Sequence, residues 1–323
     1  MNLYKAELRL TSAIGTELAA DTMFGHICWS IYYEKGEHAL KTFLAEMDSQ
    51  KPPLILSDPF SSGFLPVPVL PIMTESQREH LKTTIGQDHY KTIKDLSKAR
   101  LMSLKQFSQC KDDLSSKMVL CQLLKENKDD ALKMKRYSAP HNHVNRLGGG
   151  TIQGGIYFTE DTFIDSQGIC FDMYVLSEKF NEKEIEEILK AALKGGYGRD
   201  KSTGKGVIKV ESVKSVNLPA ADKPNAVMLL GGCVPKPDNP TNGFWNIKAK
   251  SGRLGGHWAI TKRYWKKTVM MLQSGSILLT DLPRQFYGSM VHNVHPDIPE
   301  VDHYGLAVAL PVRVNIEEKA EAV

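Results

Sequence analysis

The most unusual segment of the sequence is a glycine-rich loop, GGYGRDKSTGKG, at residues 195–206. Glycine lets backbone amides approach an anion closely, and lysine and arginine supply positive charge. This chemistry suits the phosphates of a nucleic acid. The loop therefore predicts contacts from Gly196, Gly198, Arg199, Lys201, Ser202, Thr203, Gly204 and Lys205. A flexible, solvated turn of the same composition is the alternative interpretation.

The loop lacks the spacing of a nucleotide-binding P-loop. Five residues, not four, separate Gly198 from Gly204, and Gly206 follows Lys205 where a serine or threonine is required. The pattern G-x-G-x-x-G is missing as well. A nucleotide-using enzyme is therefore the weaker interpretation.

A second basic segment, residues 244–267, contains seven lysines and arginines, no acidic residue and three of the four tryptophans of the chain. Cations interleaved with aromatic rings are typical of proteins that bind single-stranded nucleic acid, because phosphates pair with the charges and bases stack on the rings. The residues predicted to contact the nucleic acid here are Lys248, Lys250, Arg253 and Arg263. The alternative is a β-hairpin whose tryptophans lie in the core.

A third basic segment, residues 133–155, ends in a run of glycines. We expect it to form a mobile loop that wraps around a nucleic-acid backbone. The residues predicted to make those contacts are Arg136, His141, His143 and Arg146.

Residues 292–303 contain side chains of the types that bind metals, namely His292, His295, Asp297, Asp302 and His303. Two prolines make this connection loose, and the H-x-H pair at residues 141–143 lacks neighbouring carboxylates or thiols. Neither G-x-S-x-G nor H-E-x-x-H occurs in the sequence. We therefore predict no metal site, no cofactor and no catalytic group, and a structural role for His26.

The chain has 323 residues, of which 41% are hydrophobic and 24% charged, which fits a folded protein of about two domains. Forty-one basic residues against 37 acidic ones give a net charge of +4, whereas residues 76–150 contain 15 against 8, a local excess of +7. Five widely spaced cysteines without a C-x-x-C pair favour the reducing cytoplasm. No apolar run reaches the roughly 18 residues of a membrane helix.

The first half of the chain alternates between strand and helix patterns. Residues 2–10 predict a strand, and Asp21-Thr22 predicts the cap of a helix that is followed by a second amphipathic stretch at residues 40–47. Residues 156–159 and 169–175 predict a hairpin. A helix capped by Asn181 and a strand at residues 206–213 then complete a β-α-β-β-α-β order, which is ferredoxin-like.

The second half predicts mostly strands, in AVMLLGG, in residues 258–264, in TVMMLQSGSILL and in HYGLAVALPVRV. We therefore predict an α+β protein of two tandem ferredoxin-like domains with antiparallel sheets. The first covers residues 1–215, with a helical and loop insertion at about 50–150 and the glycine-rich loop after its second helix. The second is degenerate and β-rich and covers residues 216–323.

The segment ADTMFGHICWSIYYEKG, which follows the first strand and loop, resembles the "SDTLF" helix opening of the RAMP subunits of CRISPR effectors, with Ala20 where serine is common. The loop GGYGRDKSTGKG resembles the glycine-rich signature loop of that superfamily. The segments FLPVPVLP, HNHVNR, KKTVMMLQSGSILL and VDHYGLAVALPV are similar, in their order, to the fourth Csm subunit of type III-A complexes. Type III-B or III-D counterparts are near neighbours.

This resemblance implies a cytoplasmic, non-catalytic subunit that grips the 5′ repeat-derived handle of the crRNA. Its implied partners are the large polymerase-like subunit, a neighbouring backbone RAMP subunit and, indirectly, target RNA, with no membrane. The alternative is a metal-independent crRNA-processing endoribonuclease of the same superfamily, in which His26, His141 or His143 would supply general acid-base chemistry.

Overall fold

The structure is a computed structural model. It describes residues 1–73, 75, 78–79, 81, 98–125, 135–163 and 169–315. Several antiparallel sheets and a small number of helices make it an α+β fold, as predicted. Within these residues, no helix has the length and apolar character needed to cross a membrane.

The sheet of the first half is built around β1 (Asn2–Leu10), which lies between β8 (Ile169–Ser177) and β9 (Ile208–Ser215) and is antiparallel to both. Two short strands, β2 (Ile55–Leu56) and β3 (Phe60–Ser61), pair with β8 on its other side. The sheet order is β2-β8-β1-β9. The predicted strand at residues 2–10 is confirmed, since its alternate side chains are buried.

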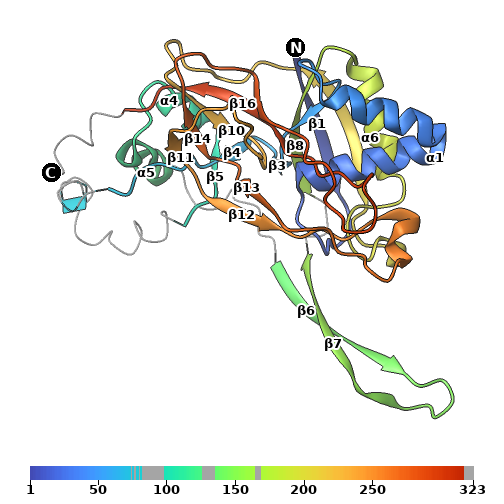
Figure 1. The fold of residues 1–323 in the computed structure, drawn as a ribbon. Helices are drawn as coiled ribbons and strands as arrows, with labels where there is room; N and C mark the ends of the chain where they lie inside the picture. Colours follow the sequence, from blue (N-terminus) through green and yellow to red (C-terminus); the bar gives the residue numbers. More distant parts are fainter. Residues whose placement is uncertain are drawn as a thin grey trace.

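The helical segment α1 (Ala20–Met47), which is broken at Gly36 (φ +82°), lies beside helix α6 (Glu182–Leu193) (Figure 1). The predicted cap of α6 is confirmed, because Asn181 and Glu184 form a reciprocal capping box. The predicted cap of α1 is wrong. Asp21 lies in the first turn of α1, and the carboxylate of Asp58 accepts the N–H of Ala20 at 2.8 Å instead.

The predicted hairpin of residues 156–159 with 169–175 is wrong. Strand β7 (Thr151–Phe163) pairs with β6 (Lys135–Val144), and β8 pairs with β1. The physical reason is burial, because β8 is buried along both of its faces whereas β7 is almost entirely exposed. The mobile loop expected at residues 133–155 is thus largely the β6–β7 hairpin, which projects away from the body of the molecule (Figure 1).

The second half forms a sheet in the order β11-β14-β10-β16-β15. Its strands are β10 (Ala226–Leu229), β11 (Gly243–Phe244), β14 (Ile277–Leu279), β15 (Phe286–Gly288) and β16 (Leu306–Val312). A separate pair joins β12 (Ile247–Lys250) to β13 (Val269–Leu272). The strands predicted in AVMLLGG, TVMMLQSGSILL and HYGLAVALPVRV are confirmed.

The strand predicted at residues 258–264 is wrong, because a 3-10 helix, η4 (Gly256–Ile260), occupies its first residues and the rest of the stretch forms no strand. Gly256, at the start of η4, has a φ of +56°, a conformation that a strand does not contain. The chain therefore turns where the apolar pattern alone indicated an extended segment.

The predicted insertion contains helices α4 (Leu104–Cys110) and α5 (Ser116–Lys125) and the strand pair of β4 (Phe64–Pro66) with β5 (Leu101–Ser103). The parts of the insertion at residues 82–97 and 126–134 lie outside the described residues. The division of the chain at residue 215 stays a prediction.

Tyr304 joins the two halves of the chain. Its ring is fully buried and stacks on Phe24 of α1 with 4.6 Å between the ring centroids. Its hydroxyl oxygen accepts the backbone N–H of Leu56 at 2.8 Å. The segment that precedes β16 is thereby attached to both a helix and a strand of the first half.

We predict that Tyr304→Phe lowers the free energy of unfolding by about 1–3 kcal/mol, because the buried N–H of Leu56 loses its acceptor. Urea unfolding followed by circular dichroism measures this change. Tyr33→Phe is the matched control, because this ring is exposed on α1, and we expect no change from it. Equal stability of Tyr304→Phe and the wild type would contradict the role given to this hydrogen bond.

Candidate nucleic-acid interface

The glycine-rich loop is held in place by Tyr197, whose side chain is fully buried. The tyrosine hydroxyl accepts the N–H of Ala19 at 2.9 Å and donates to the carbonyl of Glu17 at 3.0 Å. Burial raises the pKa of this hydroxyl above its ordinary value, so that it keeps its proton. The loop is therefore attached to the segment that leads into α1.

Two glycines of the loop are required by close packing. Gly206 has a φ of +68°, and a Cβ there would lie 2.1 Å from the carbonyl oxygen of Tyr197. Gly198 has a φ of +74°, and a Cβ there would lie 2.6 Å from Thr16. These positions therefore exclude side chains because the loop closes tightly against its own backbone and against residue 16.

The amides expected to face phosphates have acceptors inside the protein. The N–H of Gly196 donates to Leu193, that of Gly204 donates to Lys201, and that of Gly198 donates to the Nε2 atom of His26 at 3.1 Å. Phosphate binding at this loop would therefore depend on its side chains.

The side chains of the loop divide into two groups. Lys201, Ser202 and Thr203, which form the short 3-10 helix η3, are exposed. The amino group of Lys201 makes no hydrogen bond or ion pair with any described residue. Arg199 and Lys205 instead form ion pairs with Asp161 of β7, at 3.3 and 2.7 Å.

The β6–β7 hairpin places the other predicted residues at separate positions. His141 stacks on Tyr157 across the strand pair, with the ring centroids 5.2 Å apart and the planes 16° apart, and His143 packs on the same tyrosine at 5.2 Å. Side chains an odd number of residues apart on a strand point to opposite faces. Arg136, which pairs with Thr162, is an odd number of residues from His141 on β6 and therefore lies on the opposite face of the hairpin. Arg146 is exposed in the turn at the tip.

In the basic segment at residues 244–267, the four predicted cations all have partners in the protein. Lys248 and Lys250 pair with Glu17 and Asp21, at 3.4 and 2.6 Å. Arg263 pairs with Asp297, and Arg253 lies over the rings of Tyr264 and Trp265. The tryptophans of this segment are exposed or half-buried, so they do not form the core that the alternative interpretation required.

The sequence interpretation did not include an aromatic group formed by Trp29, Tyr32, Tyr33, His257 and Trp258. Trp29 of α1 lies against the backbone of Gly255 and Gly256, where added Cβ atoms would come within 2.6 and 2.5 Å of the indole. The sequence contains one signal for this group, namely the adjacent glycines Gly255 and Gly256 shortly before Trp258.

The histidines of residues 292–303 are engaged in contacts within the protein. His292 pairs with Asp48 and Asp302, both at 3.1 Å, and both ring nitrogens of His295 have backbone partners. The Nε2 atom of His303 contacts the sulfur of Met271. Among the described residues, no group of three or more histidines, cysteines and carboxylates is arranged to hold a metal ion.

His26 is neutral at pH 7. Burial and the charge of Lys201 lower its pKa to about 4, and its Nε2 lone pair accepts the amide of Gly198. An imidazole in this state has no proton on Nε2 to donate to a leaving group. The geometry instead makes His26 a support for the glycine-rich loop.

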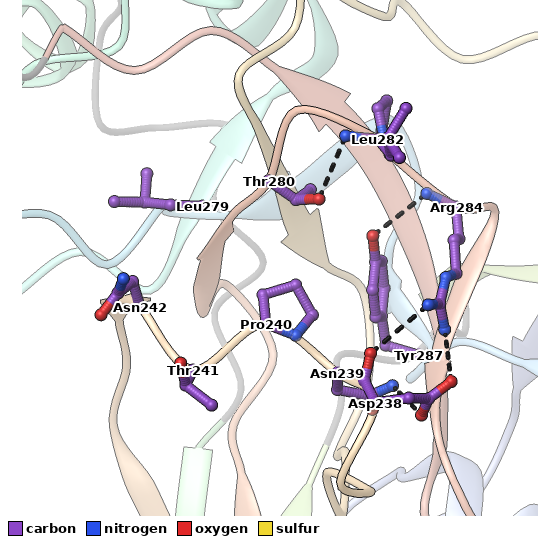
Figure 2. A pocket seen from close by; sticks show the side chains of 11 residues that line it. Asp238, Asn239, Pro240, Thr241, Asn242, Leu279, Thr280, Leu282, Arg284 and Tyr287 are labelled. Carbon is purple, nitrogen blue, oxygen red and sulfur yellow. Dashed lines mark hydrogen bonds and ion pairs between the residues drawn. The ribbon is translucent and has the colours of Figure 1, made fainter.

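A shallow pocket lies between the loop at residues 238–242 and the segment at residues 279–287 (Figure 2). Among the residues that line it, Arg284 pairs with Asp238 at 2.9 Å, and the hydroxyl of Tyr287 accepts the N–H of Arg284. None of the residues predicted to bind RNA lines this pocket.

No protein-family model matches the sequence, and no curated protein matches it significantly. Solved structures do. A chain of the Csm1–Csm4 cassette in complex with AMPPNP is 19% identical, with a TM-score of 0.60 over 98% of this chain and 99% of that one. A chain of the same cassette in complex with cA4 is 18% identical, with a TM-score of 0.61 over 97% and 99%.

A chain of the Csm3–Csm4 subcomplex of the type III-A CRISPR-Cas interference complex is 15% identical, with a TM-score of 0.53 over 97% of this chain and 100% of that one. Csm4 is the component common to these assemblies. The chain has a Csm4-like fold. The resemblance to the RAMP subunits of CRISPR effectors is thereby confirmed at the level of the fold.

We predict that the Csm4-like fold loses stability through His26 as the pH falls. The folded pKa of about 4 lies below the unfolded value of 6.5, so that between these values only the unfolded chain binds the proton. At pH 5 the loss amounts to roughly 2 kcal/mol. Urea unfolding of the wild type and of His26→Gln, in which the side-chain oxygen can still accept the Gly198 amide, should show a steeper decline in the wild type.

His292→Gln provides a control in which the change of stability with pH has the opposite sign. Although burial opposes it, the hydrogen bond and charge of Asp302, with the charge of Asp48, raise the pKa of His292. The wild type should therefore gain stability relative to His292→Gln as the pH falls through the raised folded pKa of His292, and this gain should be complete below the unfolded value of about 6.5. Parallel pH profiles for the wild type and His26→Gln would show that His26 is not held neutral.

Proposed function

We propose that the chain is a non-catalytic crRNA-binding subunit of a type III-A CRISPR ribonucleoprotein. In this role it grips the 5′ repeat-derived handle of the crRNA and links the large polymerase-like subunit to the RAMP backbone. The observation that carries the proposal is the Csm4-like fold over nearly the full length of both chains, 98% of this one and 99% of a chain of the Csm1–Csm4 cassette. The paired components of the similar assemblies support the two protein partners.

The exposed cations and rings support RNA as the ligand. Lys201 on the glycine-rich loop and Arg146 at the hairpin tip are exposed, and the rings of His141, His143 and Tyr157 form a stacked group on one face of the hairpin. Charges for phosphates together with rings for bases suit a single strand. Arg136 is also exposed, on the other face of the hairpin. Because the remaining predicted cations are engaged in ion pairs or ring contacts, we assign the first encounter with RNA to the exposed groups.

The strand order of the first half supports the ferredoxin-like assignment. The sheet order β2-β8-β1-β9, with α1 after β1 and α6 after β8, follows the β-α-β-β-α-β element order. We propose that residues 216–323 are a degenerate second unit of the same kind. Its described part, residues 216–315, contains strands and a 3-10 helix but no α-helix.

The exposed apolar side chains of the hairpin support a role inside an assembly. Tyr137, Ile156 and Phe158 are exposed on two strands that project from the body (Figure 1), and Leu147 is fully exposed at the tip. A two-stranded ribbon is marginally stable by itself, and exposed apolar groups favour contact with a partner. We propose that the neighbouring backbone RAMP subunit and the crRNA cover this ribbon.

We also place the subunit in the cytoplasm, because all five cysteines are free.

The non-catalytic assignment is supported by the state of His26. Its ring is neutral and its Nε2 atom is occupied by an amide of the glycine-rich loop, which leaves no proton on that atom for general acid catalysis. His26 is therefore not placed to serve as the general acid of a nuclease.

We predict that Lys201→Gln weakens the binding of the full-length chain to single-stranded RNA that carries a repeat-derived 5′ handle. Loss of one phosphate contact should lower the slope of log K against log salt concentration by about 0.7. Fluorescence anisotropy over a potassium chloride series measures both the affinity and the slope.

The matched control for this experiment is Lys183→Gln. Lys183 is an exposed lysine of α6 whose side chain is 86% accessible, so that this change removes the same charge from the surface outside the loop. We expect its affinity and slope to equal those of the wild type. The same slope for Lys201→Gln and the wild type would contradict RNA binding at the glycine-rich loop.

We also predict that the chain, isolated under native conditions from its own cells, carries one class of RNA. Sequencing that RNA should show a uniform 5′ end with the repeat-derived handle, and mass spectrometry should detect a large polymerase-like subunit and a backbone RAMP subunit. Mixed cellular RNA would contradict the handle assignment, and the chain without protein partners would contradict the linking role.

A further inference from the structure

One buried carboxylate, that of Asp161 on β7, joins the base of the hairpin to the glycine-rich loop. Its side chain is 2% exposed, and its Oδ2 atom lies 2.7 Å from the Nζ atom of Lys205. Its Oδ1 atom lies 3.3 Å from the Nη2 atom of Arg199, which also donates to the backbone carbonyl of Glu160 at 2.8 Å. Both of these loop cations are therefore held against one strand of the hairpin.

A second acid, Asp200, completes the charge group but does not join the two segments. Its carboxylate lies 3.3 Å from the Nε atom of Arg199 and 3.2 Å from the Nζ atom of Lys205. Asp200 belongs to the loop itself, and its side chain is 36% exposed. Although burial acts in the opposite direction, the hydrogen bonds and charges of Lys205 and Arg199 lower the pKa of Asp161, which is therefore ionised at neutral pH.

The segment that lies between the loop and the hairpin leaves room for this ion pair. Ile14 exchanges two backbone hydrogen bonds with Thr162, at 3.0 and 2.9 Å. At the next residue, Gly15, an added Cβ would lie 3.1 Å from the Nε atom of Arg199 and 3.3 Å from the Oδ1 atom of Asp161. A side chain at residue 15 would crowd both partners.

We propose that Asp161 is a positioning residue for RNA binding. It fixes Arg199 and Lys205 relative to the hairpin, so that the glycine-rich loop and the hairpin meet one RNA strand as a single rigid surface. Arg199 keeps 41% of its side chain exposed and can still reach a phosphate. Cations that are already ordered lose less conformational freedom on binding. The inference rests on the proposed RNA-binding function.

The direction in which one substitution changes the affinity for RNA distinguishes positioning from bulk electrostatics. Asp161→Asn removes a negative charge from a surface that is proposed to bind a polyanion, and charge alone would strengthen binding. Positioning predicts the opposite, because Arg199 and Lys205 lose the group that orders them.

The experiment measures binding of the full-length chain to a fluorescein-labelled single-stranded oligouridylate over a potassium chloride series. We expect Asp161→Asn to bind about tenfold more weakly, because the alignment of two charged hydrogen-bonding groups is lost. We also expect a shallower salt dependence, because fewer phosphates are neutralised.

Two further variants make the result specific. Asp200→Asn removes the same charge from the same group without touching the hairpin, and asparagine tolerates the φ of +59° at this residue. It should bind as tightly as the wild type or more tightly. Gly15→Ala changes no charge, and its methyl group crowds Arg199. It should weaken binding, as Asp161→Asn does. Gly15→Ala therefore tests the proposal even if Asp161→Asn fails to fold.

A double-mutant comparison distinguishes positioning from a general structural effect. In an Arg199→Gln, Lys205→Gln background, Asp161→Asn should cause no further loss of affinity, because the groups that it orders are gone. A full additional loss would overturn the proposal, and so would wild-type binding by both Asp161→Asn and Gly15→Ala while the wild type binds RNA with a clear salt dependence. If the wild type itself shows no salt-dependent binding, the proposed function fails together with this inference.

Discussion

The burial of a single tyrosine ring determines where the basic surface of this protein lies. Tyr197 is enclosed beneath residues 17–19, and its hydroxyl both accepts from and donates to that segment. With the ring in this position, the amide of Gly198 meets His26 on α1, and Arg199 reaches the hairpin. The loop is therefore a tight, internally bonded turn, attached at several points to elements that are distant in the sequence. This explains how a segment with five glycines keeps one shape.

Several cations of the predicted binding segments are balanced by carboxylates within the fold. Asp161 and Asp200 pair with Arg199 and Lys205, and acids before and within α1 pair with the lysines of β12. Charges that are partly buried and paired stabilise the arrangement of segments, whereas an exposed and unpaired charge remains available to a phosphate. The candidate interface thus consists of a few exposed groups, among them Lys201, and these are supported by cations that are neutralised in ion pairs. This division also accounts for the modest net charge of +4 in a proposed RNA-binding chain.

Elements with a strong local signal were predicted correctly from the sequence. The alternating pattern of β1, the capping box of α6 and the apolar run of β16 each depend on residues that are neighbours in the chain. The predictions failed where the deciding partner is distant. Asp58 replaces the expected cap of α1, and β8 pairs with β1 instead of the preceding β7. The spacing of apolar residues identifies a strand but does not name its neighbour in the sheet.

In the candidate site, too, the sequence alone identified some features and the tertiary structure decided the others. Composition by itself identified the glycine-rich loop, the basic segment at residues 133–155 and the basic segment with its tryptophans, because glycines, cations and rings are visible residue by residue. The resemblance to the RAMP subunits also lay in short segments of the sequence, and the fold confirmed it. Only the tertiary structure decided which cations are paired, because Asp161 and Arg199 are 38 residues apart and meet through the packing of the loop against the hairpin. Pair formation and burial depend on distances in space, which residue types and their spacing do not contain.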